Sequence, residues 1–145
     1  MNTNRILGFV IFNLMLTFCN AQNIKETKTR DQSSSKIEVL DFHTTHRCVT
    51  CNAIEANTKY TLENYFAKEL KSGKITFHVV NVDEVENEKL AEKFQASGTS
   101  LFLNIIKDGK EKQVDLTDFA FMYGKNKEKF SSKLKSKIDK EISNL

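Results

Sequence analysis

Short apolar segments with strand character alternate with longer helical segments through most of the chain. Residues 37–43 predict a first strand, because they are largely apolar and β-branched in their first half. Residues 74–83 predict a second strand that is apolar on both faces, which is typical of a sheet interior covered on both sides. Residues 101–106 predict a third strand, and the turn signal at 107–110 joins it to a polar strand ending near Val114.

Helices are predicted between and after these strands. Apolar residues recur at helical spacing in residues 52–71 and again in residues 127–143. Shorter helices are expected at 88–95, where Asn87 offers an N-cap, and at the aromatic-rich segment 118–123. This alternation predicts an α/β fold, a three-layer sandwich with a mixed sheet of about four strands flanked by helices.

The length and composition fit one globular domain. The chain has 145 residues, of which 39% are hydrophobic, and it carries a formal net charge of +3. This length favours a single domain, and so small a net charge gives no reason to expect a nucleic-acid partner. Three cysteines are too few for a disulfide-rich scaffold. No nucleotide-binding glycine pattern occurs, so no organic cofactor is expected.

The first 21 residues have the organisation of a secretory signal peptide. A short polar start precedes an apolar run at 6–18, and small residues precede a possible cleavage site after Ala21. The run is shorter than the roughly 20 residues of an unaided membrane span, although an uncleaved anchor is an open alternative. We therefore expect a signal peptide at 1–21, a flexible linker at 22–36 and a folded domain at 37–145 in the periplasm or another extracytoplasmic compartment.

Cys48 and Cys51 follow the first predicted strand and are separated by two residues. At the start of a helix, Cys48 would point its sulfur at free backbone N–H groups and at the positive end of the helix dipole. This environment stabilises the thiolate over the thiol. Cys51, one turn later, would be close enough to attack a mixed disulfide on Cys48. The spacing therefore predicts a catalytic dithiol, with Cys48 as the attacking sulfur and Cys51 as the resolving one.

Three nearby residues are expected to support the cysteines. His46 and Arg47 directly precede Cys48, where a cation would favour the thiolate further. Asp41 lies in the first predicted strand, seven residues before Cys48. It is either a buried carboxylate able to relay protons to Cys51 or an outward-facing strand acid, and the sequence leaves both placements open.

The same segment holds candidate metal ligands. His43, His46, Cys48 and Cys51 lie within nine residues, and two cysteines with two histidines can bind zinc. A single residue separates His46 from Cys48, which is awkward for two ligands of one centre. The alternative function is therefore a carrier of metal or metalloid (arsenite, zinc or copper) that uses Cys48 and Cys51 with His43. Haem attachment is excluded, because Asn52 follows Cys51.

Other patterns have simpler structural explanations. His78 lies within the second predicted strand and is expected to be an ordinary sheet residue. The apolar and aromatic cluster at 119–123 is expected to be core packing. The lysines of the last predicted helix are expected to form a solvated face.

Residues from Lys36 to about Lys112 resemble the thioredoxin family. The resemblance implies dithiol–disulfide exchange with a protein thiol or disulfide partner. It is carried by Leu40-Asp41-Phe42 at the end of the first strand, the C-x-x-C pair, the segment 81–94, and the hydrophobic strand followed by Lys107-Asp108-Gly109.

The sequence also resembles a small exported subgroup, the ArsF-type thioredoxin-like proteins. Members are described as thioredoxin-like subunits of nitrophenyl-compound reductases, associated with efflux of aromatic arsenicals. The resemblance implies an electron-transfer role in reducing nitroaromatic or aromatic arsenical compounds. The signal peptide and the C-x-x-C pair, rather than this resemblance, suggest a membrane thiol donor, because reducing work in an oxidising compartment needs a source of electrons. The protein is expected to be a monomer that contacts the membrane only through its signal segment. The shared residues are His43, 47–51, Ile54-Glu55, 81–84, 115–123 and the C-terminal helix.

Three features depart from the usual thioredoxin pattern. The Trp-Cys-Gly-Pro-Cys signature is absent, and the chain contains no proline. Thr99 or Ser100 falls near the place of the family's cis-proline, and we expect a trans bond there, because a cis bond without proline costs about 2.5–4 kcal/mol. The lysine that usually pairs with the buried acid aligns with Val79, so Asp41 lacks its usual partner.

Overall fold

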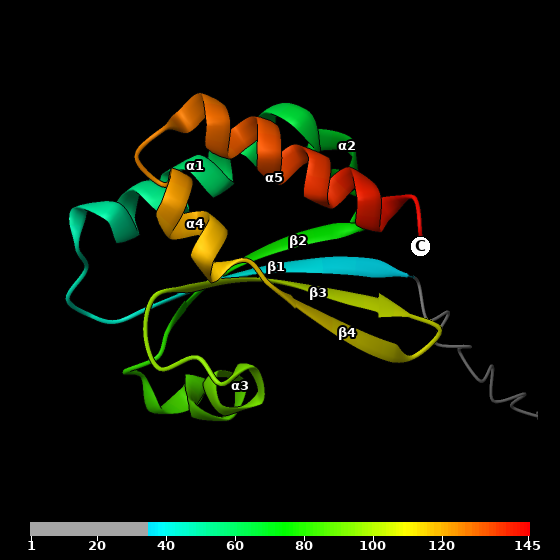
Figure 1. Cartoon of the computed structure of the whole chain (residues 1–145). Coiled ribbons are helices and arrows are strands. Elements are labelled where there is room, and N and C mark those ends of the chain that lie inside the picture. Colours follow the sequence, from blue (N-terminus) through cyan, green and yellow to red (C-terminus); the bar gives the residue numbers. More distant parts are fainter. Residues whose placement is uncertain (1–34) are drawn as a thin grey trace, which may run out of the picture. The chain divides into compact units, whose positions relative to one another are not determined.

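Strand β1 (Lys36–His43) lies inside a sheet of four strands in the order β2-β1-β3-β4 (Figure 1). It pairs in parallel with β2 (Ile75–Asn81) and antiparallel with β3 (Ser100–Lys107). Strand β3 in turn pairs antiparallel with β4 (Lys110–Asp115). The sheet is therefore mixed and has a hairpin at one edge, which confirms the α/β fold predicted from the sequence.

The computed structural model describes residues 35–145 of the chain. The predicted signal peptide at 1–21 and most of the predicted linker lie outside the described residues. Within 35–145, no helix combines the length and the apolar character needed to cross a membrane.

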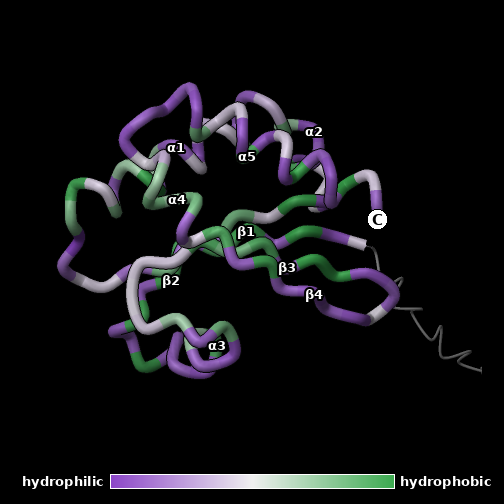
Figure 2. Tube along the Cα trace, in the orientation of Figure 1, coloured by the Kyte–Doolittle hydropathy of each residue, from purple (hydrophilic) through white to green (hydrophobic). Residues whose placement is uncertain are grey.

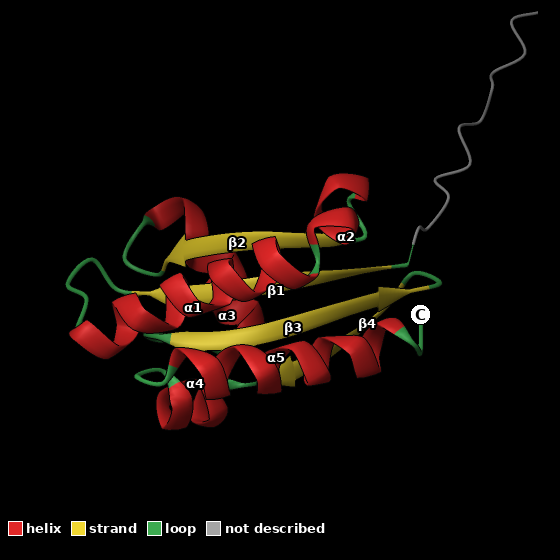
Figure 3. Ribbon diagram, turned by 90° about the horizontal axis from the view of Figure 1, so that it is seen from above, coloured by secondary structure: helices red, strands yellow, loops and turns green. Residues whose placement is uncertain are grey.

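Helices cover both faces of the sheet, which gives the three layers expected from the sequence (Figures 1 and 3). One face carries α3 (Glu88–Phe94), which follows a short 3-10 turn at Val85–Asn87. The opposite face carries α1 (Val49–Tyr65), α2 (Ala67–Ser72), α4 (Thr117–Tyr123) and α5 (Lys127–Ile142).

The first helix differs from its predicted range of 52–71. It begins at Val49, because the sulfur of Cys48 accepts the N–H of Cys51 at 3.1 Å and so caps the helix. It ends before Phe66, whose backbone leaves the helical region at φ −131° and ψ 27°. Phe66 is only 3% exposed, so the break accompanies burial of its ring in the core. The apolar spacing continues across this break, which is why the sequence indicated one helix.

Two hydrophobic clusters hold the layers together. On the α3 face, the rings of Phe42, Phe94 and Phe102 lie with centroids 5.3–5.9 Å apart. On the other face, the predicted apolar stripe of α5 belongs to a buried cluster that also contains residues of the sheet and α1. The stripe residues Phe130, Leu134 and Ile138 are each 0% exposed. Figure 2 shows the hydropathy of each residue along this helix.

Two expectations about packing are wrong. Strand β2 is an edge strand, although its apolar character on both faces suggested the sheet interior. Apolar residues on both faces of β2 indicate that helices cover both faces of the sheet, but they do not indicate whether another strand lies on each side. Val79 of this edge strand is 42% exposed. In the aromatic cluster of α4, Phe119 and Tyr123 pack against the core, but Phe121 is 46% and Met122 71% exposed. A helix on the surface buries one stripe only, so consecutive apolar residues cannot all face inward.

The local turn signals had mixed outcomes. Asp108 and Gly109 adopt φ of 51° and 73° in the β3–β4 hairpin, as the turn signal predicted. Asn87 is the N-cap residue of α3, as predicted, but its side chain makes no capping hydrogen bond to that helix. Its amide instead donates to the carbonyl of Asn81 and to the carboxylate of Glu84, both at 3.0 Å, and braces the preceding turn.

Candidate active site

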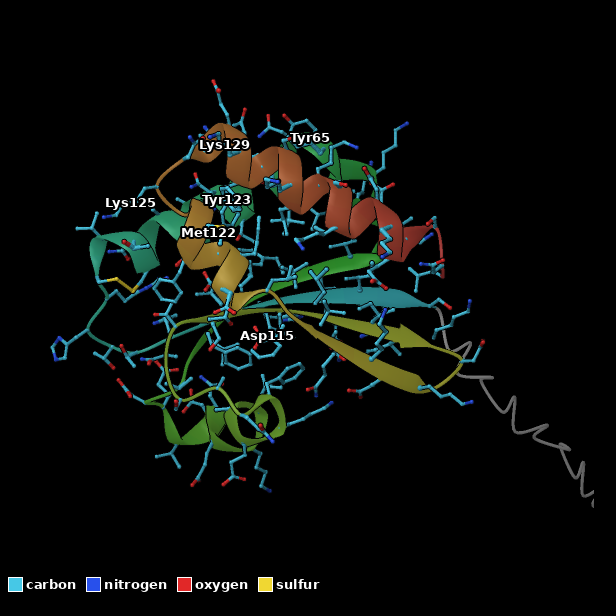
Figure 4. All side chains as sticks on the ribbon, viewed as in Figure 1. Tyr65, Asp115, Met122, Tyr123, Lys125 and Lys129 are labelled. Carbon is cyan, nitrogen blue, oxygen red and sulfur yellow. A yellow bond between two sulfur atoms is a disulfide. The ribbon has the colours of Figure 1, made fainter. Side chains whose placement is uncertain are left out.

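The disulfide between Cys48 and Cys51 occupies the first turn of α1 (Figure 4). Cys48 is the N-cap residue and is exposed, whereas Cys51 is only 7% exposed. The first turn of α1 contains no acidic residue that would oppose a thiolate at the positive end of the helix. An incoming disulfide can therefore reach the outer sulfur, while the inner sulfur is shielded.

Asp41 is buried beneath this turn. It is 0% exposed, and neither carboxylate oxygen has a hydrogen-bond partner among the described residues. Of the two placements left open by the sequence, the structure therefore shows the buried one. Its register partner on β2 is Val79, so no lysine stands where the resemblance would place the partner of this acid.

Arg47 supplies the missing cation from the other side. Its guanidinium forms an ion pair with Glu55 and lies 3.8 Å from Oδ2 of Asp41. The same group donates to the backbone carbonyl of Cys51 at 3.4 Å. The structure thus holds Arg47 between the buried acid and the inner cysteine.

Glu55 is among the residues shared with the ArsF-type subgroup, but its sequence position alone assigned it no role in the site. It follows Cys51 by four residues on α1, so both lie on the same face of the helix. That spacing, together with the proximity of Arg47 in the sequence, was the available signal. Asp41, Arg47 and Glu55 form a charged triad, in which the guanidinium of Arg47 interacts with both carboxylates.

The electrostatics of the triad set the ionisation of Asp41. The pKa of Asp41 is raised from 3.8 to about 7, chiefly by burial; Arg47 lowers the pKa and Glu55 adds a smaller increase, and both effects are included in that value. A carboxyl group with this pKa can both accept and release a proton near neutral pH. Arg47 lowers the pKa of Asp41 by less than burial raises it, and the nearby charge of Glu55 adds to the increase.

The two histidines near the cysteines have separate environments. His46 is exposed, and Nδ1 of His43 lies 2.9 Å from the carbonyl oxygen of Thr44. Asp83 lies near this loop and accepts the N–H of Thr45 at 2.7 Å. That hydrogen bond lowers the pKa of Asp83, and the two histidines contribute to the same effect.

The alternative ligand set of Cys48, Cys51 and His43 does not form a metal cluster in this structure. Across residues 35–145, no three histidine, cysteine, aspartate or glutamate side chains are grouped so that they could hold a metal ion.

Thr99 and Ser100 are half-buried where the chain enters β3. No peptide bond among residues 35–145 is cis, which confirms the trans bond expected there. The hydroxyl of Ser100 donates to the carbonyl of Gly98 at 2.9 Å. Both residues line a hollow of about 630 Å³ beside α3, and neither cysteine lines that hollow.

Comparison with known proteins gives structural neighbours only. No family model matches the sequence, and no curated protein matches it. Thioredoxin of Fasciola hepatica is 28% identical, with a TM-score of 0.38, over 57% of this chain and 69% of its own. Oxidised mitochondrial thioredoxin 3 of Saccharomyces cerevisiae is 19% identical, with a TM-score of 0.41, over 63% of this chain and 78% of its own. Oxidised thioredoxin O2 of Arabidopsis thaliana is 20% identical, with a TM-score of 0.41, over 63% and 76%.

The arrangement of the described residues is a thioredoxin-like α/β fold. Its sheet runs in the order β2-β1-β3-β4 between helical layers, and its disulfide begins the helix that follows β1.

Proposed function

We propose that this chain is an exported thiol–disulfide oxidoreductase. The proposal is supported above all by the position of the disulfide, with exposed Cys48 capping α1 and shielded Cys51 in its first turn. In the reduced protein, the thiolate of Cys48 attacks a partner disulfide, and one partner sulfur leaves as a thiolate. Cys51 then attacks the Cys48 sulfur of the mixed disulfide. The partner leaves as a dithiol, and two electrons have passed to it.

Asp41 is the proton acceptor in this proposal. Cys51 must lose its proton before it can attack, and a buried thiol resists ionisation. A carboxylate with a pKa of about 7 can take that proton near neutral pH. Arg47 contacts both the Cys51 carbonyl and Asp41, so it orients the inner half of the site.

Export is supported by the signal-peptide pattern of residues 1–21. Outside the cytosol, cysteine pairs are readily kept oxidised. Reductive work would therefore require a membrane thiol donor that returns the Cys48–Cys51 disulfide to the dithiol. Purified protein should be reduced by the correct donor, and a failure of every candidate membrane donor would contradict this part of the proposal.

The finer proposal is electron delivery for the reduction of nitroaromatic or aromatic arsenical compounds. It is supported only by the resemblance to the ArsF-type subgroup, through residues such as 47–51 and 115–123. One dithiol supplies two electrons, which with two protons convert a nitro group to a nitroso group and water. Oxidation of the reduced protein by a nitrophenyl compound, alone or with its reductase partner, would test it.

The main test pairs two cysteine variants. Cys48→Ser should abolish exchange with any disulfide, whereas Cys51→Ser should accumulate a mixed disulfide on Cys48 that mass spectrometry detects. Full exchange activity in Cys48→Ser would contradict the proposed function. Stoichiometric arsenite, zinc or copper(I) binding by the reduced protein, together with no exchange, would favour the carrier instead.

A further inference from the structure

A hollow of about 430 Å³, here called the α4–α5 groove, lies between α4 and α5. Among the described residues that line it, none is acidic. The ammonium group of Lys133 lies 5.2 Å from the ring centroid of Tyr123, and that of Lys137 lies 5.3 Å from the ring centroid of Phe119. Met122, also on its wall, is 71% exposed. The groove therefore combines apolar walls with positive charge.

The surface around the groove has an excess of lysines without carboxylate partners. Residues 117–145 contain seven lysines and four acidic residues. Two of those acids, Asp139 and Glu141, already form ion pairs. Within residues 35–145, no ion pair is recorded for six of the seven lysines: Lys125, Lys127, Lys129, Lys133, Lys137 and Lys140.

Helix α4 is fixed to the helix that carries the cysteines. The amide of Asn57 on α1 donates to the carbonyl of Gly124 at 2.8 Å, and this contact is buried. A Cβ placed on Gly124 would lie 3.0 Å from Ile54 and 3.3 Å from Thr50. Thr50 stands between the two cysteines in the sequence. Gly124, the residue that ends α4, therefore packs against Thr50 in the first turn of α1. It lies two residues after the exposed Met122, which Figure 4 labels on α4.

From these contacts we propose that the α4–α5 groove docks the protein whose disulfide Cys48 attacks, by holding a segment in which apolar and acidic residues are neighbours. The inference rests on the proposed oxidoreductase function. Charge complementarity favours an acidic partner, since unpaired lysines rim the groove. A concave groove with aromatic walls suits a peptide segment better than a flat lipid surface. One wall of the groove is α4, and Gly124 at the end of α4 packs against Thr50 in the first turn of α1.

Two synthetic peptides test this docking role. Both contain the same internal disulfide and the same apolar residues, but one is flanked by acidic residues and the other by lysines. The protein is reduced with dithiothreitol, freed of it, and mixed with each peptide in single-turnover experiments. We expect the acidic peptide to react about tenfold faster at low salt. High salt should shrink the difference, because screening weakens exposed charges.

Charge reversal locates the effect in the groove. The double variant Lys133→Glu/Lys137→Glu should slow the acidic peptide and speed the basic one. Met122→Ser should slow both peptides, since it removes apolar contact without changing charge. The matched control is Lys89→Glu/Lys110→Glu, which makes the same charge change at two exposed sites on α3 and β4 and should leave the selectivity in place.

The outcomes separate this inference from the proposed function. Equal rates for the two peptides, or an equal effect of the control pair, would overturn the docking inference alone. No exchange with either peptide would overturn the proposed function and this inference together. Binding to vesicles that contain phosphatidylglycerol tests whether the groove instead contacts a membrane surface. If Lys133→Glu/Lys137→Glu abolishes vesicle binding but leaves peptide selectivity unchanged, the groove belongs to a membrane surface and the inference is wrong.

Discussion

Two carboxylates on β1 respond to their surroundings in opposite ways. Asp41 is fully buried without a hydrogen bond, and burial raises its pKa from 3.8 to about 7. The side chain of Glu38, three residues earlier, is 23% exposed. Burial tends to raise its pKa too, but hydrogen bonds from Lys36 at 2.8 Å and Asn104 at 3.0 Å hold the pKa below its ordinary value.

The difference follows from the two faces of one strand. Side chains alternate along a strand, so residues three apart face opposite sides. Asp41 faces α1, where the nearby Arg47 also forms an ion pair with Glu55. Glu38 faces the α3 side, where donors on β1 and β3 satisfy it directly. Dedicated donors outweigh the burial of the partly exposed Glu38, whereas the cation beside the fully buried Asp41 does not outweigh its burial.

The largest expected effect comes from Asp41→Asn. The difference between a pKa of about 7 and the ordinary 3.8 corresponds to about 4 kcal/mol. Because the pKa is higher in the folded protein, Asp41 lowers stability progressively as the pH rises from about 4 through about 7. Asp41→Asn should therefore be more stable than the wild type above pH 7 and similar to it near pH 4, as measured by urea unfolding of the oxidised protein.

The same variant separates stability from chemistry. If Asp41 takes the proton of Cys51, Asp41→Asn should slow release of the mixed disulfide near neutral pH while its stability rises. Unfolding curves that keep the same pH dependence in both proteins would show that Asp41 does not have a raised pKa in the folded protein.

A second large effect is expected from Asn104→Asp. Asn104 is 1% exposed and donates to Glu38 at 3.0 Å and to Glu111 at 3.3 Å. An aspartate there would replace the donor with a third carboxylate and destabilise the protein by about 2 kcal/mol near neutral pH. The loss should shrink in acid, where the new group is protonated. Asn104→Ser, which adds no charge, is the control, and equal losses in both variants at neutral pH would contradict the charge explanation.

The position of the cysteines at a strand–helix junction was predicted from the sequence, but the charged partners of the buried carboxylate were not. Apolar periodicity and the position of Cys48 and Cys51 were enough to predict the strand–helix junction, because both depend on local spacing. The partner of Asp41 was not predicted, because Arg47 reaches it through the loop conformation between β1 and α1. The side of the sheet on which Asp41 lies depends on the strand register, and its sequence neighbours do not fix that register.

A smaller effect is expected from Glu55→Gln. Glu55 raises the pKa of Asp41, and it forms an ion pair with the guanidinium of Arg47. Removing the charge of Glu55 should therefore allow Arg47 to interact more strongly with Asp41. The titration of Asp41, followed by carboxyl NMR, should move to lower pH. Stability should fall by no more than about 1 kcal/mol, since the lost ion pair is partly exposed. An unchanged titration of Asp41 would indicate that the triad does not act as a unit.

The smallest effect is expected from Glu38→Gln, and its sign is opposite to that of Asp41→Asn. The folded-state pKa of Glu38 lies below its ordinary value of 4.5, so the ionised group stabilises the protein above that pH and the gain is lost as the pH falls. Glu38→Gln should therefore be less stable near neutral pH, by less than about 1 kcal/mol because the pair with Lys36 is partly exposed. The two proteins should converge in acid. If Glu38→Gln and Asp41→Asn shift stability in the same direction at neutral pH, then partner geometry does not separate the two faces of β1, and burial alone governs both carboxylates.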